Sequence, residues 1–446
     1  MIANLPRYPA YKPSGVDWLG DMPAHWEVRR GKTILKPVDF RSQTGQEELL
    51  TVSSERGVVP RKLANVTMFK AESYVGYKLC WKDDLVINSL WAWAQGLGVS
   101  QHHGIVSSAY GVYRLLSTGE ASPRFIHYLV RSSPFQWELQ VRSKGIWVSR
   151  LKLTDEAFLR APFPLPPLPE QRAIARYLDH VDQRIQRYID AKEQLIARLQ
   201  EARQSIIQRA VTRGLDPDVP LKPSGVDWLE DVPAHWEVRR GKTLLKPVDI
   251  RSQTGEEELL TVSSERGVVP RKSASVTMFK AESYIGHKLC WPGDLVINSL
   301  WAWARGLGVS RYHGIVSTAY GVYRLLSESK DYSQFIHYLV RSVPFQWELQ
   351  VRSKGIWISR LQLTNTAFLE ASLPVPPLAE LRAIAAHLDK ATAAIDSAIH
   401  NARRQAERMA EYRASLIAHV VTGKLDVRAA AAALSPEPAE QVPVGR

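Results

Sequence analysis

The sequence predicts an α+β protein made of two copies of one mixed module, each followed by a long helix. Three observations predict this fold class. The octapeptide KPSGVDWL occurs at 12–19 and again at 222–229. The region after each copy alternates strand-like and helix-like segments. Each module then gives way to roughly 41 residues without glycine or proline, in which apolar residues recur every three to four positions.

The two modules are a tandem duplication. Residues 12–150 align with 222–360 without a gap, and roughly four positions in five are identical. TVSSERGVVPRK, for example, recurs unchanged at 51–62 and 261–272. The two cysteines, Cys80 and Cys290, occupy the same position in the two copies. One thiol per copy favours a buried free cysteine over a zinc site or a disulfide framework.

Within the first module, β-branched and aromatic residues predict strands at 84–93, DLVINSLWAW, and at 104–116, GIVSSAYGVYRLL. The segment RFIHYLVRSSPFQWELQVRS at 124–143 predicts helix, with a break at Pro134. A proline block, PFPLPPLPEQ at 162–171 or LPVPPLAEL at 373–381, ends each module. We therefore expect modules at 1–165 and 213–375.

The segments that follow, 166–212 and 376–425, predict two long helices of roughly 60 Å. Each carries one apolar stripe that must be buried, and each can cover the other in an antiparallel coiled coil. Antiparallel pairing would relate the two modules by a pseudo-two-fold axis. The tail at 426–446 is rich in alanine and proline and is predicted to be disordered.

Composition narrows the class of partner. Of the 446 residues, 45% are hydrophobic, 58 are Lys or Arg and 45 are Asp or Glu, which gives a net charge of +13. This excess favours a polyanionic partner, and nucleic acid is the obvious one. We find no apolar run long enough to span a membrane and no signal peptide, so we expect a cytoplasmic protein with no membrane partner.

The sequence resembles the specificity subunit of type I restriction-modification enzymes. The resemblance rests on GDMPAHWEVRRGK at 20–32, on PLPPLPEQRAIARYLD at 164–179 and on the order of module, helix, module and helix up to about residue 425. It implies that the modules are target recognition domains for the two halves of a split double-stranded DNA site. It also implies that the helices are a spacer which docks two methyltransferase subunits, that restriction/motor subunits join them, and that S-adenosylmethionine binds to the methyltransferase.

In that family the two recognition domains of one subunit usually differ, whereas here they are nearly the same. Duplex DNA has local two-fold symmetry, so two-fold-related readers would fit two similar half-sites in inverted orientation. We therefore predict a nearly palindromic bipartite target. The second proline block reads PPLAELR where the first reads PPLPEQR, which weakens the signature in that copy.

Basic residues supply candidate contacts to DNA phosphates, although each could equally be a solvated surface charge. RRGK and PRK segments are repeated in both modules, and a lysine–glycine turn follows the predicted helix. The candidates are Arg30, Lys32, Arg61, Lys62, Lys144 and Arg150, with their counterparts Arg240, Lys242, Arg271, Lys272, Lys354 and Arg360. RRGKT lacks the first glycine of a phosphate-binding loop, so we reject that interpretation.

The loop after the tryptophan pair is the candidate base reader. Trp91 and Trp93 alternate along a predicted strand, which favours core packing. The glycine-rich stretch that follows gathers three differences between the copies, namely Gln95 against Arg305, Gln101 against Arg311 and His102 against Tyr312. Glutamine suits adenine edges and arginine suits guanine, so the two half-sites could differ slightly. Neutral drift of the loop is the alternative.

We identify no adenine-methylation motif, glycine-rich cofactor loop, catalytic residue or metal ligand in the sequence. It therefore predicts a specificity subunit that directs methylation and cleavage by its partners. Two alternatives stay open: a tandem scaffold or ligand-binding protein that uses its 14 tryptophans, and an independent dyad-symmetric DNA-binding protein. A salt-sensitive gel shift would test the former, and co-purification would test the latter.

Overall fold

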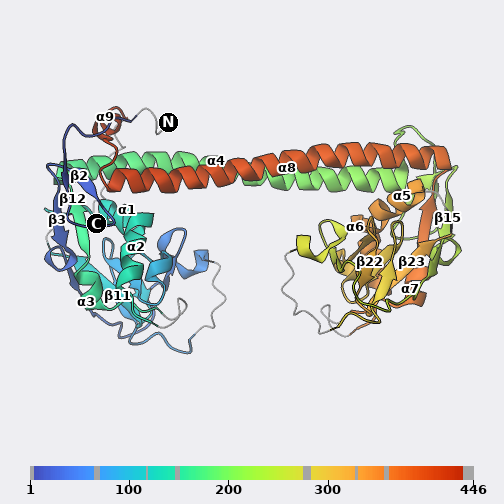
Figure 1. The fold of residues 1–446 in the computed structure, drawn as a ribbon, viewed down its shortest axis with the longest axis horizontal. Coiled ribbons are helices and arrows are strands. Elements are labelled where there is room, and N and C mark those ends of the chain that lie inside the picture. The colour runs from blue at the N-terminus through green and yellow to red at the C-terminus, as the bar shows by residue number, and fades with distance from the viewer. Residues whose placement is uncertain are drawn as a thin grey trace, which may run out of the picture. The chain divides into compact units, whose positions relative to one another are not determined.

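The computed structural model describes residues 5–64, 71–116, 119–145, 151–274, 283–326, 330–355 and 361–434. The chain divides into unit 1, residues 1–192 with 404–446, and unit 2, residues 193–403. Each unit contains one module and the adjoining stretches of two long helices (Figure 1). The predicted α+β class is confirmed, since strands and helices alternate within each module and a long helix follows it.

The module of unit 1 is built on a four-stranded antiparallel sheet in the order β4-β11-β8-β9. Two-stranded antiparallel pairs surround it. The sheet strands are β4 (Leu35–Pro37), β8 (Leu85–Asn88), β9 (Leu97–Val99) and β11 (Tyr110–Leu115). The pairs are β1 (Tyr11–Pro13) with β2 (Asp21–Pro23), β3 (Glu27–Arg30) with β12 (Pro162–Leu165), β5 (Leu50–Ser53) with β6 (Gly57–Pro60), and β7 (Lys78–Cys80) with β10 (Gly104–Val106).

The predicted helix at 124–143 is two helices, α1 (Pro123–Arg131) and α2 (Ser133–Arg142). They separate at Ser132, whose extended backbone is followed by Pro134 in the first turn of α2. Proline is tolerated there because the first amides of a helix have no partner within it. A short helix, α3 (Asp155–Leu159), begins at Thr154, whose side chain accepts a hydrogen bond from the Ala157 N–H.

Unit 2 repeats this architecture with the sheet order β16-β23-β20-β21. The sheet strands are β16 (Leu245–Pro247), β20 (Leu295–Asn298), β21 (Leu307–Val309) and β23 (Tyr320–Leu325). The pairs are β13 (Leu221–Pro223) with β14 (Asp231–Pro233), β15 (Glu237–Arg240) with β24 (Ser372–Val375), β17 (Leu260–Ser263) with β18 (Gly267–Pro270), and β19 (Lys288–Cys290) with β22 (Gly314–Val316). The helices are α5 (Lys330–Val340), α6 (Val343–Arg352) and α7 (Asn365–Leu369).

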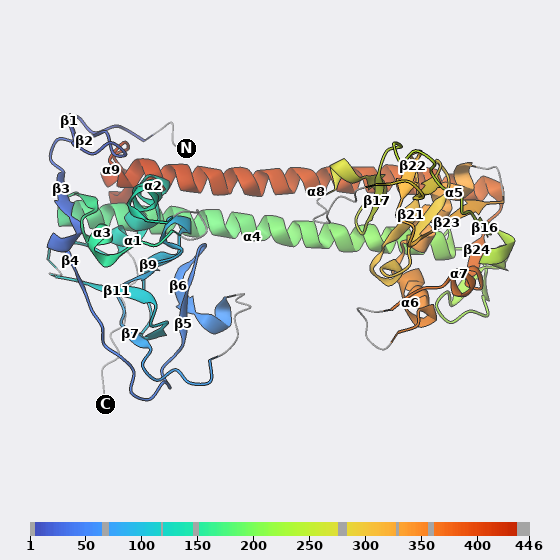
Figure 2. The same cartoon turned by 60° about the horizontal axis from the view of Figure 1, so that its bottom comes forward.

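The two long helices, α4 (Leu168–Arg213) and α8 (Leu378–Val421), pack antiparallel, as the sequence predicts. In unit 1, Asp182 pairs with Arg413 at 3.4 Å, and the Tyr188 hydroxyl donates to the Gln405 side chain at 3.1 Å. Residue numbers therefore rise along α4 as they fall along α8. Figure 2 shows the two helices side by side from a second direction.

The apolar stripes of both helices join the module cores. In unit 1, one core cluster combines Trp26 and Phe125 of the module with Ile174 of α4 and Leu416 of α8. A second, smaller cluster contains Cys80, which is a buried free cysteine as predicted. Unit 2 repeats both clusters. Each module therefore contributes to the burial of the helix stripes, along with the partner helix.

One buried carboxylate connects the two segments on which the family resemblance rests. Glu170, 6% exposed at the start of α4, accepts hydrogen bonds from the Trp26 indole N–H at 2.9 Å and from the Tyr8 hydroxyl at 2.7 Å. The His25 Nε2 lies 2.8 Å from its other oxygen. Burial and the hydrogen bond to Glu170 raise the pKa of Tyr8 well above its ordinary value, so Tyr8 stays a donor.

The weakened signature of the second copy has a structural cause. In unit 1, the fully buried Gln171 accepts from the Ser122 N–H at 2.8 Å, just before α1, and donates to the Pro166 carbonyl at 2.8 Å. In unit 2, α5 starts before the position equivalent to Ser122, so this amide lies inside the helix. Leu381 replaces the glutamine and packs in the core.

The start of the predicted disordered tail has regular structure, which corrects that prediction for 426–434. Residues Arg428–Ala432 form a helix, α9, and Val427 and Ala431 are fully buried. The Asp426 N–H donates to the Pro6 carbonyl at 2.8 Å, and the Tyr11 hydroxyl donates to the Gly423 carbonyl at 3.1 Å. Amino-acid composition could not predict these contacts, because they join residues near the two ends of the sequence. Residues 435–446 lie outside the described part of the chain.

No helix in the described part of the chain combines the length and the apolar character that crossing a bilayer requires. This agrees with the helix stripes, which alternate with charged residues along α4 and α8.

The Glu170 anchor generates a first prediction. Glu170→Ala leaves the buried donors of Trp26 and Tyr8 unpaired, which should lower the free energy of unfolding of unit 1 by about 2–4 kcal/mol. Urea titration followed by tryptophan fluorescence measures the loss. The matched control is Glu380→Ala, because Glu380 is 26% exposed and Asp218 stands at the position of Tyr8, so the second copy lacks that buried hydroxyl. The control should cost less, and equal losses would contradict the prediction.

Candidate nucleic-acid interface

The candidate reading loop begins where β8 ends. Asn88 closes a turn, because its carbonyl accepts from the Trp91 N–H at 3.0 Å and its side chain accepts from the Leu90 N–H at 3.2 Å. The chain then enters a short 3-10 helix at Ala92–Ala94. Trp91 is 60% exposed and stacks on Trp93 with ring centroids 6.4 Å apart. The predicted strand position and core packing are therefore wrong for Trp91, because the turn at Asn88 ends the strand first.

The positions that distinguish the two copies have the same backbone. Gln95 and Arg305 both adopt the left-handed conformation, with φ of 62° in each. The next residue must be glycine, because a Cβ on Gly96 would lie 2.6 Å from the Trp91 carbonyl oxygen. The backbone conformation is therefore the same whether glutamine or arginine occupies this position.

A half-buried arginine, which the sequence analysis did not single out, holds this backbone in place. Arg131 of α1 donates to the carbonyls of Leu97 at 2.7 Å and Ser54 at 2.6 Å, with a longer contact to Gln95 at 3.2 Å. Burial, followed by the charge of Arg413, lowers the pKa of Arg131 to about 10. Arg341 makes the equivalent contacts in unit 2. Arg131 connects the β5–β6 turn to the candidate reading loop in unit 1. Arg341 connects the β17–β18 turn to the equivalent loop in unit 2.

Next to it lies a partly buried histidine. The Nδ1 atom of His127 accepts a hydrogen bond from the Val99 N–H at 3.2 Å, and His337 accepts from Val309 at the same distance. Burial, followed by the charge of Arg341, lowers the pKa of His337 to about 3, and the pKa of His127 is also well below its ordinary value. Both imidazoles are therefore neutral acceptors at neutral pH.

The second part of the loop is a tight turn after β9. The Ser100 hydroxyl donates to the His102 carbonyl at 2.8 Å and accepts from the His102 N–H at 3.1 Å. Ser310 and Tyr312 repeat this pattern. Gln101 and Arg311 are exposed at the tip of the turn, and Tyr312 is 38% exposed.

The predicted phosphate contacts at the end of β3 lie on the surface. Arg30 is exposed and donates to the Arg160 carbonyl at 2.8 Å, and Arg240 donates to the Glu370 carbonyl at 2.7 Å. Lys32 is exposed, whereas Lys242 forms an ion pair with the Glu370 carboxylate at 2.7 Å.

The basic pair after β6 and β18 lies in short 3-10 helices, Arg61–Leu63 and Arg271–Ser273. Lys62 pairs with Glu48 at 2.8 Å and Lys272 pairs with Glu258 at 2.7 Å, yet both lysines are more than 70% exposed. Arg61 and Arg271 are half-buried beside them.

Lys144 and Lys354 are exposed and lie in isolated bridges, paired with Lys152 and Gln362. Arg150 and Arg360 lie outside the described residues.

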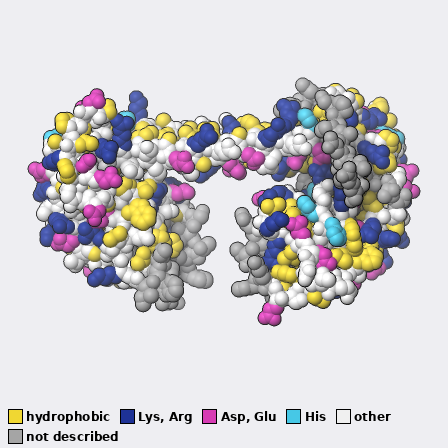
Figure 3. Space-filling view, turned by 180° about the vertical axis from the view of Figure 1, so that it is seen from behind, with side chains coloured by type: hydrophobic (Ala, Val, Ile, Leu, Met, Phe, Trp, Pro, Cys, Tyr) yellow, Lys and Arg dark blue, Asp and Glu magenta, His cyan; other side chains and the backbone are white. Residues whose placement is uncertain are grey.

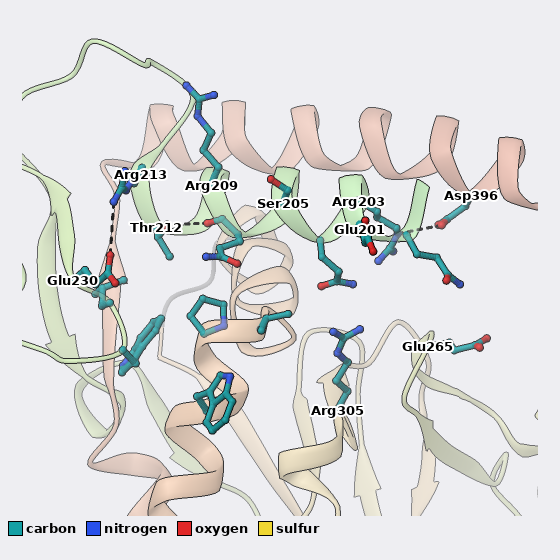
Figure 4. A pocket seen from close by; sticks show the side chains of 18 of the residues that line it. Glu201, Arg203, Ser205, Arg209, Thr212, Arg213, Glu230, Glu265, Arg305 and Asp396 are labelled. Atoms are coloured by element: carbon teal, nitrogen blue, oxygen red, sulfur yellow. Dashed lines mark hydrogen bonds and ion pairs between the residues drawn. The ribbon is translucent and has the colours of Figure 1, made fainter. Parts of the chain in front are cut away.

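The structure brings some of these candidates together in unit 2. Lys272, Arg305, Arg311 and Tyr312 line one cavity of about 730 Å³, which also has walls from α4 and α8. Arg240, Lys242 and Lys354 do not line it. Arg305 also lines an adjoining cavity of about 1790 Å³, where its side chain points toward α4 (Figure 4). Three further arginines at the smaller cavity, Arg203, Arg266 and Arg341, come from elements that sequence patterns alone could not place beside the loop.

Charge over the rest of each unit is mixed. On the face shown in Figure 3, lysine and arginine side chains are interspersed with aspartate and glutamate in both units. Within the described ranges, no three histidine, cysteine or carboxylate residues gather as a metal-binding group.

The fold matches that of solved proteins. A chain from a study of complex assembly and conformational transition in the type I R-M (restriction-modification) system matches with a TM-score of 0.64 and 15% identity, over 91% of this chain and 99% of that one. The HsdS subunit from Thermoanaerobacter tengcongensis follows with a TM-score of 0.48 and 16% identity, over 91% and 98%. The type I restriction-modification S subunit from M. genitalium gives 0.35 and 11%, over 89% and 96%.

No model of a protein family matches the sequence, and no curated protein matches it. The first of the three structural matches covers both modules and both helices, so the resemblance drawn from the sequence is confirmed at the level of the fold.

These two histidines generate a prediction about pH. Because His337 stays neutral when folded but takes up a proton near its ordinary pKa of 6.5 when unfolded, stability should fall as pH drops from 6.5 toward 3. His337→Asn keeps an acceptor for the Val309 N–H and removes the titrating group. It should reduce the loss of stability by up to about 2 kcal/mol near pH 5.

Melting temperatures between pH 7 and pH 4.5 measure this effect. His180→Asn, on the exposed face of α4, is the matched control and should follow the unmodified chain. An unchanged pH profile for His337→Asn would show that the His337 imidazole is not the titrating group.

Proposed function

We propose that this chain, whose fold is that of a chain in the type I R-M system, is the DNA-specificity subunit of a type I restriction-modification complex. The observation that carries the proposal is the likeness in fold across nearly the whole length of both chains. Two nearly identical modules, a net charge of +13 and a loop whose side chains differ between copies support it. In this role the chain binds a bipartite double-stranded DNA site and leaves the chemistry to its partners.

The proposed partners are two methyltransferase subunits and restriction/motor subunits. The matching chain belongs to an assembled type I R-M complex, which supports an assembled state for this one. Adenine methylation requires the target base to leave the duplex and enter a pocket. We assign that pocket and the S-adenosylmethionine to the methyltransferase. This chain would determine where on the DNA the enzyme acts.

The proposed target is close to palindromic. Two equivalent helices that pack antiparallel are related by a two-fold axis, and the ion pair and hydrogen bond between α4 and α8 establish the antiparallel direction. Duplex DNA has the same local symmetry, so two similar readers suit inverted half-sites. The modules are similar enough for this, since they share sheet order and loop geometry.

The proposed base-reading positions are those that differ between the copies. Gln95 and Arg305 occupy the same backbone conformation, held by Arg131 and Arg341. Gln101 and Arg311 are exposed at the following turn. Because glutamine favours adenine and arginine favours guanine, one or two base pairs should distinguish the half-sites.

Mapping of methylated adenines tests the function directly. The chain, co-expressed with a methyltransferase subunit from the same source, should direct methylation to a split motif whose two halves are nearly inverted copies. Omission of this chain should abolish sequence-specific methylation. Two dissimilar halves would overturn the inverted arrangement, and unchanged methylation without the chain would overturn the function itself.

Exchange of the variable loop residues tests base reading. The double variant Gln95→Arg, Gln101→Arg gives unit 1 the residues of unit 2, so the two half-sites of the mapped motif should become more alike. The backbone already accommodates arginine at this position in unit 2, so the fold should be retained. Arg187→Gln on the exposed face of α4 is a control that should leave the motif unchanged. An unaltered motif in the double variant would eliminate the loop as the reader.

A further inference from the structure

A basic recess lies within unit 2, between the module and the stretches of α4 and α8 that belong to this unit. It has a volume of about 730 Å³. Its cationic side chains are Arg203, Arg266, Lys272, Arg305, Arg311 and Arg341. The carboxylates that line it are Glu265, Asp389 and Asp396. The neighbouring His337 is neutral, since burial depresses its pKa, so cations outnumber anions in this unit 2 recess.

Two of the arginines have N–H groups without a hydrogen-bond partner among the described residues. The Arg203 Nε lies 3.1 Å from the Asp396 carboxylate, but this N–H does not satisfy hydrogen-bond geometry with any described atom. The Arg305 guanidinium has no hydrogen-bond or ion-pair partner among the residues that the structure describes. Arg203 and Arg305 line the same recess, and burial together with the charge of Arg203 lowers the pKa of Arg305. Like charges held this way favour an anion between them.

Two of the three carboxylates at the recess are already engaged, and the third, Glu265, is exposed. Asp389 accepts a hydrogen bond from the Tyr338 hydroxyl at 2.6 Å and contacts the Gln334 amide, and Asp396 pairs with Arg203. Arg341 donates to backbone carbonyls, which leaves its positive charge unneutralised. Among the described residues, the Arg203 Nε and the guanidinium groups of Arg305 and Arg311 therefore have donors available.

The equivalent positions of unit 1 carry less positive charge. Gln95 replaces Arg305 and Gln101 replaces Arg311. Asp182 stands where unit 2 has Thr392, and it pairs with Arg413, the counterpart of Arg203. In unit 1 the loop therefore supplies neutral amides where unit 2 has two arginines. These positions are therefore less basic in unit 1 than in unit 2.

We propose that the unit 2 recess binds a phosphate group, held by the guanidinium groups of Arg203, Arg305 and Arg311. Guanidinium groups match phosphate because their planar N–H donors can contact two oxygens at once. The volume suits one phosphate with its immediate substituents and is too small for a duplex. The phosphate could belong to a nucleic-acid backbone or be inorganic, and the chemistry of the recess is the same for both.

This inference goes beyond the proposed function and does not depend on it, because phosphate binding by unit 2 can be measured without DNA. It would give the helix residue Arg203 a binding role in addition to a packing one. It assigns Arg305 to phosphate in place of the base reading proposed above, because its side chain points toward α4 in the adjoining cavity (Figure 4), and the sequence preference of Arg305→Gln distinguishes the two roles.

The test uses the full chain and inorganic phosphate at constant ionic strength, with sodium chloride as the balancing salt. Phosphate should raise the unfolding temperature in a saturable way, and ³¹P line broadening should report the same binding. Arg305→Gln should weaken the apparent affinity about tenfold or more, because a charge-assisted contact is lost. This variant should fold, since Gln95 occupies the same conformation in unit 1.

Two matched variants complete the set. Arg305→Lys retains the charge and should restore part of the affinity. Arg187→Gln removes one exposed charge from α4 outside the recess and should bind phosphate like the unmodified chain. Equal binding by Arg305→Gln and the unmodified chain, or no effect of phosphate beyond that of chloride, would overturn the proposal.

The salt dependence of DNA binding identifies the source of the phosphate. If the recess holds a backbone phosphate, Arg305→Gln should reduce the slope of log K against log salt concentration by about 0.9 without changing the preferred sequence. An unchanged slope, with inorganic phosphate binding lost, would assign the recess to free phosphate. A changed sequence preference with phosphate binding intact would overturn the proposal in favour of base reading. A chain that binds no DNA but binds phosphate would refute the proposed function alone.

Discussion

The apolar stripe along each long helix is the constraint on which the rest of the structure depends. A helix of 46 residues with one apolar face is stable in water only if that face is covered. Here α4 and α8 cover each other, and the modules cover what remains, since Ile174 and Leu416 share one core with Trp26. The buried Glu170 then fixes where the module joins the helix. The helix therefore has a defined starting point relative to the strands that precede it.

Much of the fold could be predicted because it follows from local patterns and from the duplication. The 3–4 spacing of apolar residues indicated both helices, and Pro134 indicated the break between α1 and α2. The two failures had different causes, one a local turn and the other a contact between distant segments. The Asn88 turn left Trp91 exposed, and α9 formed because the C-terminal segment meets residues near Pro6. No local pattern encodes contacts across more than 400 residues.

The candidate site was only partly predictable, for a related reason. Comparison of the two copies singled out Gln95, Gln101 and His102, because substitutions on a repeated background stand out. The same comparison could not find Arg131 and Arg341, which are identical in both copies and act through backbone carbonyls. Nor could it find Arg203, whose position beside the loop depends on how α4 packs. Residues that support a site resemble ordinary helix residues in sequence.

The left-handed residue that precedes Gly96 has a consequence for how this chain could diversify. Its backbone angles are set by the surrounding carbonyls and by the glycine, and they are the same whether the side chain is glutamine or arginine. Mutation here can therefore alter charge and hydrogen-bonding capacity with little penalty to folding. After a gene duplication, such a position lets one copy acquire a new chemical preference while its twin keeps the old one.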